Sequence, residues 1–76
     1  MEIQSFVDKF ASQFDETDLS EFKPETCFRD LDEWNSFLAL AIMAMIKTHY
    51  DVAVTAQEMR DAQTIQDLFN IVQSHI

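Results

Sequence analysis

Phe37-Leu-Ala-Leu-Ala-Ile-Met-Ala-Met-Ile46 is a run of ten consecutive apolar residues. Ala, Leu and Met are strong helix formers, and neither Gly nor Pro interrupts the run. Asn35 is a residue type favoured at a helix N-cap, and Lys47 and His49 would place positive charge at the helix C-terminus, where the dipole favours it. The stretch therefore predicts a helix from Ser36 to about His49. Because a helix that is apolar on all sides is normally central, we expect this one to form the buried core.

Two segments with helical periodicity flank this run. From about Glu2 to Phe14, apolar residues recur at steps of three and four and fall on one stripe: Ile3, Phe6, Val7, Phe10 and Phe14. The last segment, roughly residues 65–75, has a similar stripe: Ile65, Leu68, Phe69, Val72 and Ile76. We expect a helix in each segment, packed through its stripe.

Two pairs of residues mark further helix starts. Thr55 with Glu58 has the pattern of a capping box, which predicts a short helix that ends near Arg60 or Asp61. Thr64, with Asp67 three residues later, opens the last helix. The fold class is therefore all-α, with three longer helices and one short one.

The connection between the first two expected helices, residues 15–35, has no periodicity and holds eight of the 14 acids of the chain. A solvated surface is the simplest interpretation of that charge. Four apolar residues are spaced through the connection, and we expect them to hold it against the core: Leu19, Phe22, Phe28 and Leu31. Long loops in small domains are usually functional when they are ordered.

The length and net charge of the chain favour some classes of function over others. The 76 residues suffice for a single domain, 1–76, which we expect to be monomeric. The formal net charge of −9 disfavours nucleic acid and anionic membrane surfaces, and it favours a basic protein partner. No apolar run reaches the roughly 20 residues that span a bilayer, and the start lacks a signal-peptide pattern, so we expect a cytoplasmic protein. The single Cys27 is then most simply a partly buried apolar residue.

Catalytic and metal-binding patterns are missing from the sequence. His49 and His75 are far apart and have no nearby set of Cys or carboxylate residues, so we expect no metal site. No Ser-His-Asp arrangement is identifiable, and the chain is not expected to be an enzyme.

One stretch resembles a known family. Phe28-Arg-Asp-Leu-Asp-Glu-Trp-Asn-Ser-Phe-Leu38 is similar to the attachment site of acyl carrier proteins, in which Phe-x-x-Leu leads to Asp-Ser-Leu and the Ser opens the second helix. The Leu-x-Glu-Trp-Asp-Ser-Leu form of one branch is followed at Leu31, Glu33, Trp34 and Ser36. Tyr50-Asp-Val and Thr64-Ile-Gln-Asp-Leu resemble later parts of the family, so the resemblance covers nearly the whole chain in order and spacing.

The resemblance implies an acyl-carrier-like four-helix bundle with a long loop between helices 1 and 2. It implies a 4′-phosphopantetheine arm on Ser36, transferred from coenzyme A by a phosphopantetheinyl transferase. The arm would hold an acyl or aminoacyl group as a thioester, as in fatty acid or polyketide biosynthesis. Further partners would be a loading ligase or acyltransferase and the enzymes that accept the group.

Two departures from the family affect recognition. Asn35 stands where the family usually has Asp, which the resemblance connects with binding of the metal–coenzyme complex by the transferase. Leu38 and Ala41 stand where many carriers have acids, so electrostatic steering is expected from the preceding loop. The candidate recognition residues are Asp30, Asp32, Glu33, Trp34, Asn35, Phe37, Leu38 and Ala41. Trp34 could equally cover the core.

A different class of function remains open. Ser36 could be no more than part of a helix cap, and the apolar second helix could bind a partner groove or a second copy of the chain. The protein would then be an unmodified helical interaction module.

Overall fold

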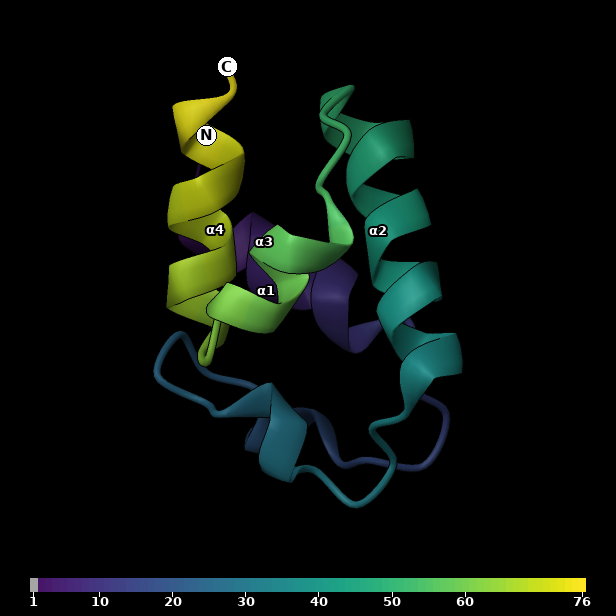
Figure 1. The fold of residues 1–76 in the computed structure, drawn as a ribbon. Coiled ribbons are helices and arrows are strands. Elements are labelled where there is room, and N and C mark those ends of the chain that lie inside the picture. The colour runs from purple at the N-terminus through teal and green to yellow at the C-terminus, as the bar shows by residue number, and fades with distance from the viewer. Residues whose placement is uncertain (1) are drawn as a thin grey trace.

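The computed structural model describes residues 2–76, which form four α-helices and no β-strand (Figure 1). The helices are α1 (Ile3–Ala11), α2 (Ser36–Tyr50), α3 (Ala56–Asp61) and α4 (Ile65–Ser74). Two 3-10 turns lie in the connection between α1 and α2: η1 (Leu19–Glu21) and η2 (Phe28–Asp30). The all-α class, with three longer helices and one short one, is confirmed for these residues.

The predicted stripes of the first and last helices meet in the core. Phe6 and Phe10 of α1 are fully buried, and the Phe6 ring packs against Phe69 of α4 at 5.4 Å between centroids. Every apolar residue of the α4 stripe is buried except Ile76, which lies beyond the helix and is 75% exposed. The inclusion of Ile76 in the stripe was therefore wrong.

α1 ends at Ala11, three residues earlier than the periodicity predicts. Ser12 explains this end, because its hydroxyl donates to the carbonyl of Lys9 at 2.7 Å. A continuing helix would use that carbonyl for the N–H of Gln13, which instead bonds the carbonyl of Phe10 at 3.2 Å. Local side-chain bonds of this kind compete with the helix. Phe14 is still buried, since the tighter turn returns it to the core.

The expected helix starts are confirmed by their caps. The Asn35 side chain accepts from the N–H of Leu38 at 2.9 Å. Complete capping boxes begin α3, with Thr55 and Glu58, and α4, with Thr64 and Asp67. These caps satisfy backbone donors that would otherwise lack partners.

The expectation that the second helix is buried on all sides is wrong. α2 lies along one side of the molecule (Figure 1), and only one of its faces packs inward. Ile42 is fully buried, whereas Phe37 is 76% and Leu40 is 64% exposed. A domain of 76 residues has too few other elements to cover every face of a helix.

The long connection lies beneath the helices in the view of Figure 1 and is held to them at several points. Phe22 and Phe28 are buried against Phe10, with centroid distances of 6.2 and 5.4 Å. Two backbone bonds join the connection to the start of α4, from Ile65 to Thr26 at 3.2 Å and from Gln66 to Pro24 at 2.8 Å. The connection is therefore fixed against the core, as expected.

Two smaller expectations about this connection fail. Leu19 is 72% exposed on η1 and does not hold the loop to the core, whereas Leu31 packs on the core while remaining half-buried. Cys27 is exposed rather than partly buried, because its backbone pairs with Thr64 in an isolated bridge while its side chain stays at the surface.

Within residues 2–76, no helix is long and apolar enough to cross a membrane.

Candidate functional site

Ser36 is the first residue of α2, and its side chain is exposed. The preceding Asn35 is extended, with φ of −157°, and its side chain caps the N–H of Leu38. The first turn of a helix has further N–H groups without an internal partner, and its dipole is positive at this end. A serine hydroxyl here is open to reagents and suits a phosphate-bearing group.

Ser36 also lines a largely apolar cleft between α2 and α3, which we call the α2–α3 cleft. Its volume is about 380 Å³. The lining residues are Arg29, Trp34, Ser36, Ala39, Leu40, Met43, Ala56, Met59 and Arg60. Because Ser36, Ala39, Leu40 and Met43 are separated by three or four residues, they form one stripe of α2. The exposed serine therefore continues an apolar wall.

Arg29 joins η2 to α3 at this cleft. Its guanidinium donates to the carbonyl of Met59, and it lies 6.0 Å from the centre of the Phe28 ring. This hydrogen bond links η2 to the C-terminal part of the short helix α3. The position of α3 opposite Ser36 therefore depends partly on a residue of the long connection.

Trp34 packs on the core, as one of its two expected roles requires, and part of it stays at the surface, where the other expected role, partner contact, remains a prediction. Its ring is half-buried and packs on Phe28 at 4.8 Å and on Phe10 at 6.4 Å between centroids. It also lines the cleft beside Ser36. The tryptophan thus covers the core and contributes to the surface around the serine.

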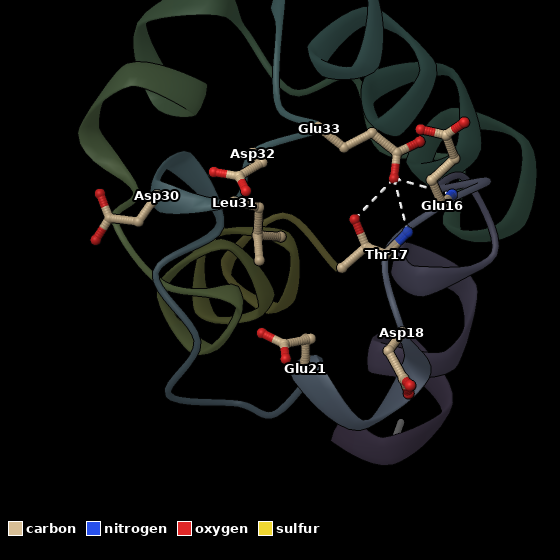
Figure 2. A pocket seen from close by; sticks show the side chains of 8 residues that line it. All are labelled: Glu16, Thr17, Asp18, Glu21, Asp30, Leu31, Asp32 and Glu33. Carbon is tan, nitrogen blue, oxygen red and sulfur yellow. Dashed lines mark hydrogen bonds between the residues drawn. The ribbon is translucent and has the colours of Figure 1, made fainter.

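A second, polar pocket of about 510 Å³ lies in the long connection, and we call it the acidic pocket (Figure 2). Its lining residues are Glu16, Thr17, Asp18, Glu21, Asp30, Leu31, Asp32 and Glu33. Among residues 2–76, no group of three His, Cys, Asp or Glu side chains is arranged to hold a metal ion. The acidic pocket therefore presents a field of negative charge and no metal-ligand set.

Among the acids of this pocket, Glu33 has the carboxylate that accepts the most hydrogen bonds, whereas Asp18 accepts one from the N–H of Ser20. Glu33 accepts from the backbone N–H groups of Asp15, Glu16 and Thr17 at 2.9, 3.1 and 2.9 Å, and from the Thr17 hydroxyl at 2.7 Å. Figure 2 shows the bonds to Glu16 and Thr17. The Thr17 hydroxyl, followed by the backbone donors, lowers the pKa of Glu33 below its ordinary value. Glu33 is a structural anchor, whereas Asp30 and Asp32 are exposed.

The predicted recognition residues are divided between the surface and the core. Asn35 and Phe37 are exposed next to Ser36, and Ala41 is half-buried. Leu38 is only 6% exposed and belongs to the core cluster, so a partner cannot make substantial contact with it. The exposed apolar residues of α2 near Ser36 are instead Phe37 and Leu40.

Several cleft residues were missed by the sequence reasoning. Leu40 and Met43 had a usable signal, since they follow Ser36 at helical spacing. Arg29, Met59 and Arg60 had none, because they reach the cleft from segments whose packing no local pattern specifies. Comparison with protein-family models, curated proteins and solved structures finds no match for this chain.

Proposed function

We propose that this protein is an acyl carrier that bears 4′-phosphopantetheine on Ser36. The observation that carries the proposal is the position of that serine, exposed at the start of α2 and on the rim of the apolar α2–α3 cleft. The four helices with one long connection are compatible with an acyl-carrier-like bundle. The ordered resemblance on both sides of Ser36 is its second support.

The attachment reaction requires only an accessible serine hydroxyl from this chain. In a transferase complex the Ser36 oxygen attacks the β-phosphorus of coenzyme A, and its proton passes to a base of the transferase. A phosphodiester forms on the serine, and adenosine 3′,5′-bisphosphate leaves. The unpaired N–H groups of the first turn of α2 then face the new negative charge. The bound arm supplies a terminal thiol that holds an acyl or aminoacyl group as a thioester for enzymes that load or accept it.

Asp30 and Asp32 lie close in sequence to Ser36 and are exposed, so they are suited to attract a basic enzyme. Replacing both with Lys is expected to slow modification at low salt while leaving the rate at high salt nearly unchanged. Equal rates for both proteins at low salt would remove the steering role.

Intact mass tests the attachment. After incubation with coenzyme A and a broad-specificity phosphopantetheinyl transferase, the protein is expected to gain the mass of one phosphopantetheine. Ser36→Ala is expected to abolish the gain. Ser20→Ala is the control, because Ser20 is also exposed and follows a cap, that of Asp18, but lies away from α2. No gain with several transferases, or a gain that survives Ser36→Ala, would refute the carrier proposal.

A second candidate rests on Phe37 and Leu40, which expose large apolar side chains on one helix. In this role the unmodified α2 packs against an apolar groove of a partner or against a second copy of the chain. Sedimentation velocity of the unmodified protein tests self-association. A dimer that Leu40→Glu dissociates, together with no mass gain at Ser36, would favour this role over the carrier.

A further inference from the structure

The α2–α3 cleft is lined by positively charged side chains, although the protein as a whole is strongly acidic. The chain has 14 acids and five bases, and Arg29 and Arg60 are its two arginines. Both line the cleft, and no Asp or Glu does. Their neighbours in sequence, Asp30 and Asp61, do not line it either. Both arginines of this strongly acidic protein therefore lie at the same apolar cleft.

Neither arginine is neutralised by the protein. Within residues 2–76, the ion pairs closer than 4 Å are Lys47 with Asp51 and, when the imidazole is protonated, His75 with Glu58. Arg29 donates to the Met59 carbonyl, and Arg60 donates to the side-chain oxygen of Gln57 at 3.2 Å. A guanidinium has five N–H donors, so most donors of both arginines remain available to a ligand.

We propose that the cleft receives an acyl chain whose far end carries a carboxylate, and that Arg29 and Arg60 bind this carboxylate. The proposal rests on the proposed carrier function, because the chain would arrive on the arm of Ser36. It specifies the class of cargo, which the carrier function leaves open. A cavity of about 380 Å³ is within the range of small-ligand pockets, about 300–1,000 Å³.

The lining residues of the cleft offer different contacts to the two ends of such a ligand. Ala39, Leu40 and Met43 of α2 and Ala56 and Met59 of α3 offer apolar contacts to a hydrocarbon stem. A plain acyl chain would need only these walls. Arginine adds a planar set of donors that matches the two oxygens of a carboxylate.

The arginines also lie on different elements from Ser36. Arg29 belongs to η2 and Arg60 to α3, whereas the serine begins α2. The phosphodiester of an arm stays next to the serine and the first N–H groups of α2. Ser36 and both arginines still line one cleft, so the phosphodiester is the competing anion that the test must distinguish from a carboxylate at the far end.

Two loaded forms of the protein test the proposal. A broad-specificity transferase is used to install either a hexanoyl or an adipoyl arm on Ser36 from the corresponding acyl-coenzyme A. The two cargoes have six carbons each and differ in whether the far end is a methyl or a carboxylate. Because cargo seated in the folded cleft stabilises the folded state, the adipoyl form is expected to have the higher Tm.

Arg60→Gln and Arg29→Gln are expected to reduce this difference in Tm, and the double variant to abolish it. Arg60→Gln is the more informative single variant, because Arg29 also holds α3 in place. Lys23→Gln is the matched control, since it removes a cation outside the cleft. Equal Tm values for the two loaded forms of the wild type would overturn the proposal. An effect of the arginine variants that is equally large without any acyl group would also overturn it, in favour of phosphodiester binding.

A separate titration keeps this test independent of the attachment chemistry. Unmodified protein is titrated with octanoate or with 1-octanol, which have the same chain length, and the amide shifts of cleft residues are followed by NMR. Octanoate should bind about fivefold more tightly than 1-octanol, which corresponds to an exposed ion pair of about 1 kcal/mol. Arg60→Gln should remove that advantage. If Ser36 is never modified but octanoate still binds more tightly, the carrier function fails and the cleft retains its preference for anions. Equal affinities would overturn the preference itself.

Discussion

At the scale of single residues, Glu33 is the most heavily bonded side chain of the long connection. Its four bonds go to donors 16 to 18 residues earlier in the chain. They hold the segment that follows α1 beside the segment that enters α2. Since these donors favour the ionised form, the pKa of Glu33 is lower in the folded than in the unfolded protein. Its contribution to stability is therefore present above the unfolded pKa and is lost as the pH falls through the folded pKa.

Glu33→Gln is expected to lower the Tm at neutral pH, because the amide offers one acceptor and a misplaced donor group. The difference in Tm from the wild type should shrink as the pH falls through the lowered pKa of Glu33, where the carboxylate becomes protonated. Thermal unfolding followed by circular dichroism at several pH values measures it.

Glu25→Gln is the control for that experiment, since it removes the same charge from an exposed position of the same connection. Its Tm should stay close to that of the wild type throughout. A Glu33→Gln difference that does not change with pH would contradict the assigned role of the carboxylate.

Asn35 allows the cap and the attachment reaction to be tested separately. Asn35→Ala removes the acceptor for the N–H of Leu38 and is expected to cost about 1 kcal/mol, which lowers the Tm by roughly 4–8 °C. Asn35→Asp keeps an acceptor and adds a negative charge at the positive end of α2, so it should retain the Tm. With the carrier proposal, Asn35→Asp is also expected to be modified faster, as measured by the time course of intact mass. Slower modification of Asn35→Asp would contradict this interpretation of the position.

At the scale of elements, α2 has two apolar faces with different environments. Ile42 is fully buried, whereas Leu40, two residues earlier, is 64% exposed. Ile42→Ala is expected to destabilise the protein by about 2–5 kcal/mol through lost packing and a cavity. Leu40→Ala should change stability by less than about 1 kcal/mol, since it removes little buried surface. Urea unfolding of both variants measures the two costs, and comparable costs would show that the exposed face is buried in solution, for example by a second copy.

The accuracy of the sequence predictions varies with the kind of signal. The helices α1 and α4 each have one apolar and one polar face, so most of their buried residues could be named in advance, although Ala11 was not named and Ile76 was named wrongly. The helix starts were equally accessible, because Asn35, Thr55 and Thr64 cap through local bonds. α2 gave no such signal, since Ile42 and Leu40 are both apolar and only tertiary packing distinguishes them. The end of α1 depended on one competing bond of Ser12, which periodicity does not include.

The same distinction holds for the candidate site. Ser36 is predicted from the ordered set of residues on both sides that resembles the acyl-carrier attachment site, which is a pattern along the sequence. The cleft beside it was not found as a set, because Arg29, Met59 and Arg60 come from separate segments. A site made of one helix wall and two distant contributions becomes visible only when the chain is folded.

At the scale of the whole molecule, a net charge of −9 is confined within 30 by 24 by 20 Å. Few of the acids in the described part of the chain are paired with a base. Among residues 2–76, Lys47 with Asp51 brings opposite charges within 4 Å, and His75 with Glu58 does so only when the imidazole is protonated. Mutual repulsion of the remaining acids destabilises the compact state.

Raising NaCl from 10 to 300 mM is therefore expected to raise the Tm, because the screening length falls from about 30 Å to below 10 Å. Scanning calorimetry at neutral pH measures this. A Tm that falls with added NaCl would mean that attractive pairs outweigh repulsion in the folded state.

The Glu33 anchor has a consequence for how this protein responds to its surroundings. By joining residues 15–17 to residue 33, the carboxylate closes a ring of chain without sulfur, in a protein whose single cysteine cannot form an internal disulfide. A disulfide closing the same ring would be opened by a reductant. This closure is opened by acid and forms again on neutralisation, without any enzyme. The segment that leads to Ser36 is therefore expected to loosen in acid, a response that adding a reductant would not reproduce.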